Sequence, residues 1–267
     1  MPVDVVDLRS FYSSPLGGVA RQLLARALSR AWPSAAHLRV LGLGYATPYL
    51  PLFADGTERL AAYMPATQGV VNWPSSGLSA SALVDPTMLP LADASYDRVL
   101  LVHALEHSEA PAEVLSEVWR ILTPGGRLLA VVPNRRGPWA RMDSTPFGHG
   151  QPYSRSQLKA LMRQTLFSPE LWLDALYVPP SDARLLLRSA WAWEQAGTRL
   201  ALPFAGVHVV EATKQLYRPI TVRAAKPALR LQPALLPSAG ATMSPGRSVR
   251  AGLGRDADPW SRPRPQR

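Results

Sequence analysis

The chain has 267 residues, of which 47% are hydrophobic, so it is long enough for one large domain with a full core and an appendage. It contains no cysteine, which excludes disulfides, thiolate chemistry and cysteine-based metal sites. Its formal net charge is +10, but residues 219–267 hold nine basic and two acidic residues and therefore supply +7 of it. The rest of the chain is close to neutral, so the net charge says little about a substrate.

Residues 219–267 also contain eight prolines and no sustained apolar period. We predict a disordered basic tail there, following a domain of residues 1–218. The charges of the tail are scattered and Trp260 is its one aromatic side chain, so we do not expect nucleic-acid binding. No apolar run approaches the roughly 20 residues of a membrane span, and the N-terminus does not resemble a secretion signal, so we expect a cytoplasmic protein. The sequence does not indicate an oligomeric state.

Apolar spacing and turn residues predict the elements of the domain. In chain order they are a helix over 14–32, strands over 37–43 and 58–64, a weaker strand at 70–71 or 82–84, a strand over 99–102, a helix over 112–122, a strand over 128–132, a helix over 154–165, an edge strand over 176–178, a helix over 182–197 and a strand over 207–217. Strands and helices thus alternate along much of the domain.

The stretch of residues 89–134 is the most informative about the fold class. Residues 99–102 form a short, wholly apolar run, as in a strand buried on both faces. Residues 112–122 have the three-to-four-residue spacing of an amphipathic helix, which Pro124-Gly125-Gly126 ends. Residues 128–132 form the next strand. This βαβ unit predicts an α/β fold with a doubly wound, mostly parallel sheet and helices on both faces.

Four segments match, in order, motifs of one family. Residues 40–48 contain a strand and a glycine turn, which lets backbone approach a nucleotide and is expected to lead into a helix N-terminus. Residues 85–91 match the motif D-A-x-x-L-P-F, residues 96–99 the strand start F-D-x-V, and residues 122–128 the turn L-x-P-G-G-x-L. Over residues 37–165 the chain resembles the class I S-adenosylmethionine-dependent methyltransferases, particularly their type 11 family. The resemblance implies a Rossmann-like methyltransferase fold.

The same resemblance implies S-adenosylmethionine as the cofactor. It would bind at the carboxyl ends of the strands, where doubly wound sheets bind their ligands. Asp85 keeps the position that the resemblance assigns to the adenine amino group, although a turn cap is the alternative. The residues expected at the cofactor are Gly42, Gly44, Tyr45, Ala46, Met64, Asp85, Met88 and His103.

This chain departs from the family at the cofactor turn. Gly42 replaces an acid, Ala46 and Pro48 replace two glycines, and only Gly44 keeps a family glycine. Met64 stands where the family carries the acid that accepts hydrogen bonds from the ribose, and a thioether is a poor acceptor. Losing such a hydrogen bond costs ~1.5–3 kcal/mol, or about tenfold to a hundredfold in affinity.

Residues 103–107, His-Ala-Leu-Glu-His, match the H-x-x-E-H pattern of certain zinc proteases. That chemistry needs a helix, which places both imidazoles on one face. Here the pattern follows a buried strand directly, and similar Leu-Glu-His endings occur in the methyltransferase family without metal. We therefore expect no metal site, and expect His103 and Glu106 to line the cofactor pocket or to cap the sheet.

The loop after the 128–132 strand supplies the candidates for catalysis. His149 and Tyr153 lie in a glycine-flanked loop, and a histidine can accept a proton near neutral pH. The resemblance implies that this loop helps to build the acceptor pocket, so we expect these two residues to position or deprotonate the acceptor. It also implies that residues 9–14, with Tyr12, fold over the cofactor as a lid. Trp191 and Trp193 are expected either in the core or at a hydrophobic pocket or partner surface.

We therefore expect a methyltransferase that uses S-adenosylmethionine to methylate a small-molecule or protein acceptor. The altered glycine turn and the missing ribose acid leave an alternative, a catalytically degenerate member of this fold that serves as an interaction or regulatory module. A nicotinamide-dependent oxidoreductase would need the pattern G-x-G-x-x-G and a ribose acid some 20 residues later, and this chain lacks both.

Overall fold

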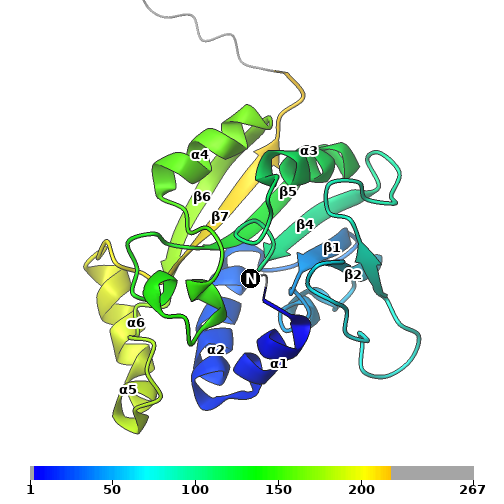
Figure 1. The fold of residues 1–267 in the computed structure, drawn as a ribbon. Coiled ribbons are helices and arrows are strands. Elements are labelled where there is room, and N and C mark those ends of the chain that lie inside the picture. The colour runs from blue at the N-terminus through cyan, green and yellow to red at the C-terminus, as the bar shows by residue number, and fades with distance from the viewer. Residues whose placement is uncertain (1–2, 218–267) are drawn as a thin grey trace, which may run out of the picture. The chain divides into compact units, whose positions relative to one another are not determined.

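The computed structural model describes residues 3–217, and the tail predicted for residues 219–267 lies outside them. Its centre is a seven-stranded sheet in the order β3-β2-β1-β4-β5-β7-β6, drawn in Figure 1. The strands are β1 (Arg39–Gly44), β2 (Arg59–Pro65), β3 (Ser81–Val84), β4 (Tyr96–Val102), β5 (Leu122–Pro133), β6 (Phe167–Ala175) and β7 (Val207–Lys214).

The strands β1 to β5 are parallel to one another, whereas β7 runs antiparallel between β5 and β6. In the centre of the sheet, Leu41 of β1 lies beside Ala61 of β2 on one side and Val99 of β4 on the other. The strand order reverses its direction at β1 and β4, and ligands of doubly wound sheets bind at such a point. The doubly wound, mostly parallel sheet is thus confirmed.

Helices cover both faces of this sheet, as predicted. One face carries α3 and α4, whose Leu115 and Leu158 are buried in one apolar cluster with Val99. The opposite face carries α1 and α2, and Leu24 is buried there with Leu100. The helices are α1 (Val5–Ser13), α2 (Pro15–Ala31), α3 (Pro111–Ile121), α4 (Arg155–Gln164), α5 (Arg184–Arg188) and α6 (Ala190–Arg199), with 3-10 turns η1 (Leu50–Phe53), η2 (Trp139–Arg141) and η3 (Pro146–Gly148).

Local sequence explains where two of these helices begin. Ser14 caps α2 by accepting a hydrogen bond from the N–H of Gly17 at 3.0 Å, and Pro15 occupies the first helical position, where its missing N–H costs nothing. Ser154 and Gln157 form a reciprocal capping box at the start of α4. Both starts lie within one residue of their predicted positions.

Three elements differ from the prediction. The edge strand predicted over 176–178 is wrong, because β6 ends at Ala175 and Leu176 adopts a left-handed φ of 64° that breaks the extended run. The helix predicted over 182–197 is divided into α5 and α6 at Ser189, whose hydroxyl donates back to the carbonyl of Leu185. The helix α1, capped by Asp4, is absent from the prediction.

The connection from β1 to β2 also differs. Its described residues form only the short 3-10 turn η1, since prolines at 48 and 51 remove backbone donors and disfavour a helix. The glycine turn is therefore not followed by the expected α-helix N-terminus.

Trp191 and Trp193 are 49% and 42% exposed, so core packing is excluded for both. Among the described helices, none is both long and apolar enough to cross a membrane.

Candidate functional site

The glycine turn after β1 is pressed against the end of β4. Gly44 has a left-handed φ of 84°, and a Cβ there would lie 2.2 Å from the carbonyl oxygen of Val102. The next N–H, that of Tyr45, donates to the same oxygen at 2.8 Å. A Cβ at Gly42 would lie 2.7 Å from Cβ of Ala46. Both glycines thus allow the turn to pack closely on its own neighbours.

Three tyrosines fill the space beside this turn, and we call them the tyrosine cluster: Tyr12, Tyr45 and Tyr49. Tyr12 comes from α1 and stacks on Tyr45, with ring centroids 5.6 Å apart and planes at 22°. The hydroxyl of Tyr49 donates to that of Tyr12 at 3.2 Å. The hydroxyl of Tyr12 also lies 2.8 Å from Nε2 of His103. Burial raises the pKa of Tyr12 and of Tyr49, so both phenols stay neutral and hydrogen-bonded at physiological pH.

Protein side chains also fill the space at the carboxyl end of β2. Met64, which stands in place of the ribose acid, is fully buried, and its sulfur accepts a weak hydrogen bond from the N–H of Val71 at 3.4 Å. Gln68, three residues beyond β2, is 4% exposed and donates from Nε2 to the carbonyl of His103 at 3.0 Å. Gln68 could not be recognised as a site residue from the sequence, because an amide in a loop has no pattern of its own.

The residues expected at the cofactor therefore fall into two groups. Six of them are buried around the tyrosine cluster: Gly42, Gly44, Tyr45, Ala46, Met64 and His103. The other two, Asp85 and Met88, are exposed, Met88 to 74%. Asp85 accepts hydrogen bonds from the hydroxyl of Thr87 at 2.7 Å and from its N–H at 2.8 Å, and these hold the pKa of Asp85 below its usual value. Asp85 thus acts as the cap of its own turn.

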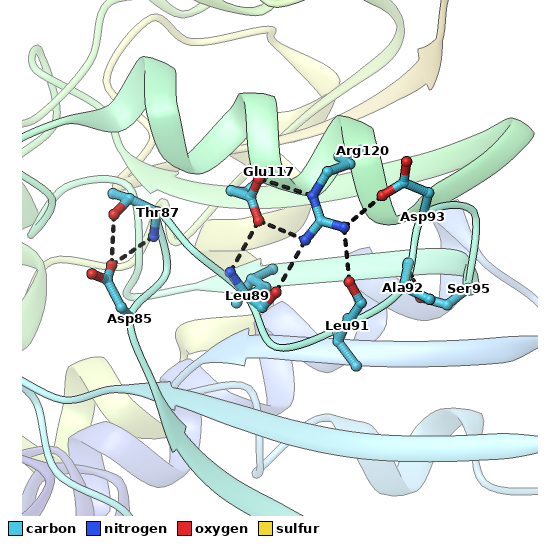
Figure 2. A network of polar contacts seen from close by, with 9 residues as sticks. All are labelled: Asp85, Thr87, Leu89, Leu91, Ala92, Asp93, Ser95, Glu117 and Arg120. Atoms are coloured by element: carbon cyan, nitrogen blue, oxygen red, sulfur yellow. Dashed lines mark hydrogen bonds and ion pairs between the residues drawn. The ribbon is translucent and has the colours of Figure 1, made fainter.

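Figure 2 shows how the loop between β3 and β4 is fastened to α3. Arg120 of α3 donates to the carbonyl of Leu89 at 3.0 Å and to that of Leu91 at 2.7 Å. It also pairs with Asp93 at 2.7 Å and with Glu117 at 2.8 Å. Glu117 in turn accepts the N–H of Leu89 at 3.0 Å. A single guanidinium therefore fixes the segment of the family motif at residues 85–91 onto the helix.

A tight turn after β4 encloses three titratable side chains. His103 adopts a left-handed φ of 51° and is 1% exposed, and Glu106 is 2% exposed. Nδ1 of His103 lies 3.2 Å from Oε1 of Glu106. Burial raises the pKa of Glu106, but the imidazoles of His103 and His107 outweigh it and hold that pKa below its usual value. Burial lowers the pKa of His107. The turn is not helical, as predicted from the sequence.

A cavity of about 640 Å³ lies between α1 and the loop that contains η3. Its lining includes three carboxylates, Asp7, Asp143 and Asp182, together with Phe11 and His149. Nε2 of His149 lies 2.8 Å from the carbonyl oxygen of Asp143. Since a carbonyl only accepts, Nε2 carries the proton and Nδ1 is the basic nitrogen. The three acids come from distant parts of the chain, so no sequence pattern links them.

Tyr153 lies apart from that cavity's lining. Its hydroxyl donates to the carbonyl of Leu105 at 3.3 Å, and its side chain is buried. Burial, with a smaller contribution from Glu106, raises the pKa of Tyr153 to about 12. The structure therefore places His149 at a cavity and Tyr153 beside the turn after β4, rather than together at one pocket.

Comparison with known proteins finds relatives of the central segment. Residues 55–130 match the model of a methyltransferase domain family. A curated protein of Mycolicibacterium smegmatis, named a probable S-adenosylmethionine-dependent methyltransferase, is 36% identical over 84 residues, which are 31% of this chain and 32% of that protein. The aligned segment thus spans about a third of the length of that relative.

Solved structures share the fold of the whole domain. A methyltransferase of Thermotoga maritima, described as a possible histamine N-methyltransferase, aligns with 79% of this chain and 96% of its own at a TM-score of 0.54 and 19% identity. The 4+2 cyclase SpnF aligns with 73% of this chain and 80% of its own at a TM-score of 0.51 and 18% identity. At these identities, the likeness concerns the fold alone.

Proposed function

We propose that this protein methylates a small molecule. The premise is that residues 55–130 belong to the methyltransferase domain family and that the domain has the class I methyltransferase fold. The fold and the family imply S-adenosylmethionine as the cofactor. The observation that carries the proposal is the reversal of strand order at β1 and β4, where Gly44 brings the cofactor turn against the end of β4.

The residues at that point do not fit the cofactor in the described conformation. Tyr45 is 5% exposed, and Met64 and Ala46 are fully buried, so the expected contact positions face their own protein neighbours. Tyr12 covers them from α1, which lies over the ends of the strands. In this proposal the protein is an enzyme whose α1 has to move before the cofactor binds.

The acceptor in this proposal carries a positive charge. Asp7, Asp143 and Asp182 line the cavity of about 640 Å³, which lies within the size range of small-molecule sites. Carboxylates attract a cationic group such as an amine, and the basic Nδ1 of His149 can accept the proton that an amine must lose before it is methylated. This gives His149 the acceptor-side role that its loop position suggested.

The proposal is tested with the full chain in two assays. Calorimetry with S-adenosylmethionine measures cofactor binding by the wild type and by Tyr12→Ala. Transfer of a labelled methyl group is then compared between amines and neutral alcohols of similar size. Asp182→Asn is expected to lower kcat/KM for the amine about fivefold, whereas Asp55→Asn, at an exposed position outside the cavity lining, leaves it unchanged. Absence of binding at millimolar cofactor in both proteins would contradict the proposal.

A second candidate function is favoured by the buried cofactor turn. A class I fold whose cleft is permanently filled by the tyrosine cluster would serve as a scaffold or catalyse other chemistry, and the fold is shared with the 4+2 cyclase SpnF. The two candidates differ in the result expected for Tyr12→Ala, since removing the ring strengthens cofactor binding only if the cleft behind it is intact. A Tyr12→Ala protein that is folded and still binds no cofactor favours the second candidate.

A further inference from the structure

The turn after β4 brings three metal-ligating side chains to one point inside the domain. One nitrogen each of His103 and His107 and one carboxylate oxygen of Glu106 lie within 4.8 Å of one another. His103 and Glu106 are at most 2% exposed, and His107 is half-buried. The convergence does not need a helix, because the left-handed φ of His103 turns the chain back on itself.

The polar atoms that converge there lack hydrogen-bond partners. No described residue forms a hydrogen bond with Nδ1 of His103, either carboxylate oxygen of Glu106, or Nε2 of His107, although all four atoms are buried. Buried polar atoms of native proteins are nearly always satisfied, and burying a carboxylate without hydrogen bonds is especially costly. Four such atoms on three neighbouring side chains indicate a binding partner at this point.

The distance between two of these atoms suits a metal ion. Nδ1 of His103 and Oε1 of Glu106 are 3.2 Å apart, but no hydrogen bond between them is aligned. Two ligands bound to zinc at about 2.0–2.1 Å in tetrahedral geometry are about 3.3 Å apart. The spacing is therefore that of two ligands of one ion.

The surroundings supply what a ligating histidine needs. When Nδ1 of a histidine binds a metal, its Nε2–H usually donates to a nearby oxygen, which fixes the tautomer and the ring. Nε2 of His103 has such a partner in the hydroxyl of Tyr12 at 2.8 Å. A small cavity of about 30 Å³, lined by His107 and Gln68 among others, has room for a water molecule.

We propose that His103, Glu106 and His107 bind a divalent transition-metal ion, with zinc the best match to two imidazoles and one carboxylate. Mg²⁺ and Ca²⁺ prefer sets made of oxygen atoms, which this turn does not offer. Three protein ligands leave a fourth position for water or another ligand, as in zinc sites with two histidines and one glutamate. The expectation of no metal had two grounds: the pattern lacks a helix here, and similar Leu-Glu-His endings occur in the resembled family without metal. The proposal departs from it because the left-handed φ of His103 brings the three side chains together without a helix.

The first test is zinc binding by the full chain after treatment with a chelator. Calorimetry with zinc chloride is expected to give one ion per chain, and zinc is expected to raise the melting temperature. Glu106→Gln, which keeps the size of the side chain, and His107→Ala are each expected to weaken binding about 100-fold. The matched controls Glu109→Gln and His37→Asn, both at exposed positions, are expected to bind zinc like the wild type.

Two results would overturn the proposal: a wild-type chain that binds no zinc, or binding that is unchanged in both ligand variants. Circular dichroism shows whether the variants fold. If neither variant folds, the visible spectrum of the cobalt-loaded wild type tests the proposal. A four-coordinate cobalt site absorbs visible light intensely, whereas the hexahydrated ion does not. None of these measurements involves S-adenosylmethionine, so the result is independent of the proposed methyl transfer.

Discussion

The hydroxyl of Tyr12 lies 2.8 Å from Nε2 of His103, which joins the N-terminal helix to the turn after β4 across 91 residues of sequence. This hydrogen bond is buried, and it lies where the strand order reverses between β1 and β4. It connects the segment that covers the expected cofactor positions with the three side chains of the proposed metal site. Tyr12 is therefore the residue whose replacement is most informative.

Replacing Tyr12 is expected to change cofactor affinity. If α1 has to move before S-adenosylmethionine binds, the wild type must break a buried hydrogen bond worth ~1–1.5 kcal/mol, so Tyr12→Ala should bind about tenfold more tightly. Tyr12→Phe keeps the ring and should gain less. Calorimetry measures both. Weaker binding by Tyr12→Ala than by the wild type would instead make Tyr12 a cofactor contact.

Gly44 is expected to tolerate no side chain. Gly44→Ala places a Cβ 2.2 Å from the carbonyl oxygen of Val102 at a φ of 84°, so we expect a loss of at least about 2 kcal/mol in the free energy of unfolding. Gly18→Ala is the matched control, because its Cβ would meet nothing within 4 Å in helix α2. That change should stabilise the protein by about 0.5–1 kcal/mol. Urea unfolding measures both, and equal effects would contradict the account.

Arg120 is expected to hold the loop between β3 and β4. Arg120→Ala removes the donors to the carbonyls of Leu89 and Leu91, so the free energy of unfolding should fall by about 1–2 kcal/mol and the amides of residues 85–95 should exchange faster. Asp93→Asn, at a side chain that is 80% exposed, should cost less than about 0.5 kcal/mol. Loop exchange that is unchanged in Arg120→Ala would refute the role of this clamp.

Asp97 is expected to make stability depend on pH in the acid range. The side chain of Arg39 holds the pKa of Asp97 below its usual value, with further hydrogen bonds from the Arg39 N–H and from Thr123. A lowered pKa in the folded state gives stability that is present above the unfolded pKa of about 3.9 and is lost as pH falls through the folded value. Asp97→Asn should therefore cost about 1–2 kcal/mol at pH 7 and progressively less below about pH 4. Urea unfolding at several pH values tests this, and a cost independent of pH would contradict it.

Much of the central sheet could be predicted because its signals are local. The apolar run at residues 99–102, the amphipathic spacing of α3 and the turn Pro124-Gly125-Gly126 depend only on neighbouring residues, so the βαβ unit follows from them. The end of β6 could not be predicted in the same way. Leu176 leaves the strand with a left-handed φ, and its N–H is bound by Glu194, 18 residues along the chain.

The candidate sites, too, could be predicted from the sequence only in part. Cofactor positions were predicted from motifs, and their residues lie at or near the carboxyl ends of β1, β2, β3 and β4. Whether that space is open depends on Tyr12, which arrives on a helix that the sequence pattern did not predict. The carboxylates of the large cavity come from α1, from the loop after β5 and from the segment before α5, and no spacing rule joins them.

The sequence by itself determined the fold class of this protein and its resemblance to a methyltransferase family, because strand and helix periods and short motifs are properties of neighbouring residues. Only the tertiary structure decided that the turn expected at the cofactor is covered, and that His103, Glu106 and His107 meet with polar atoms that lack hydrogen bonds. The reason is physical: burial and convergence depend on which distant segments pack together, and on a backbone angle at His103 that its residue type permits but does not require.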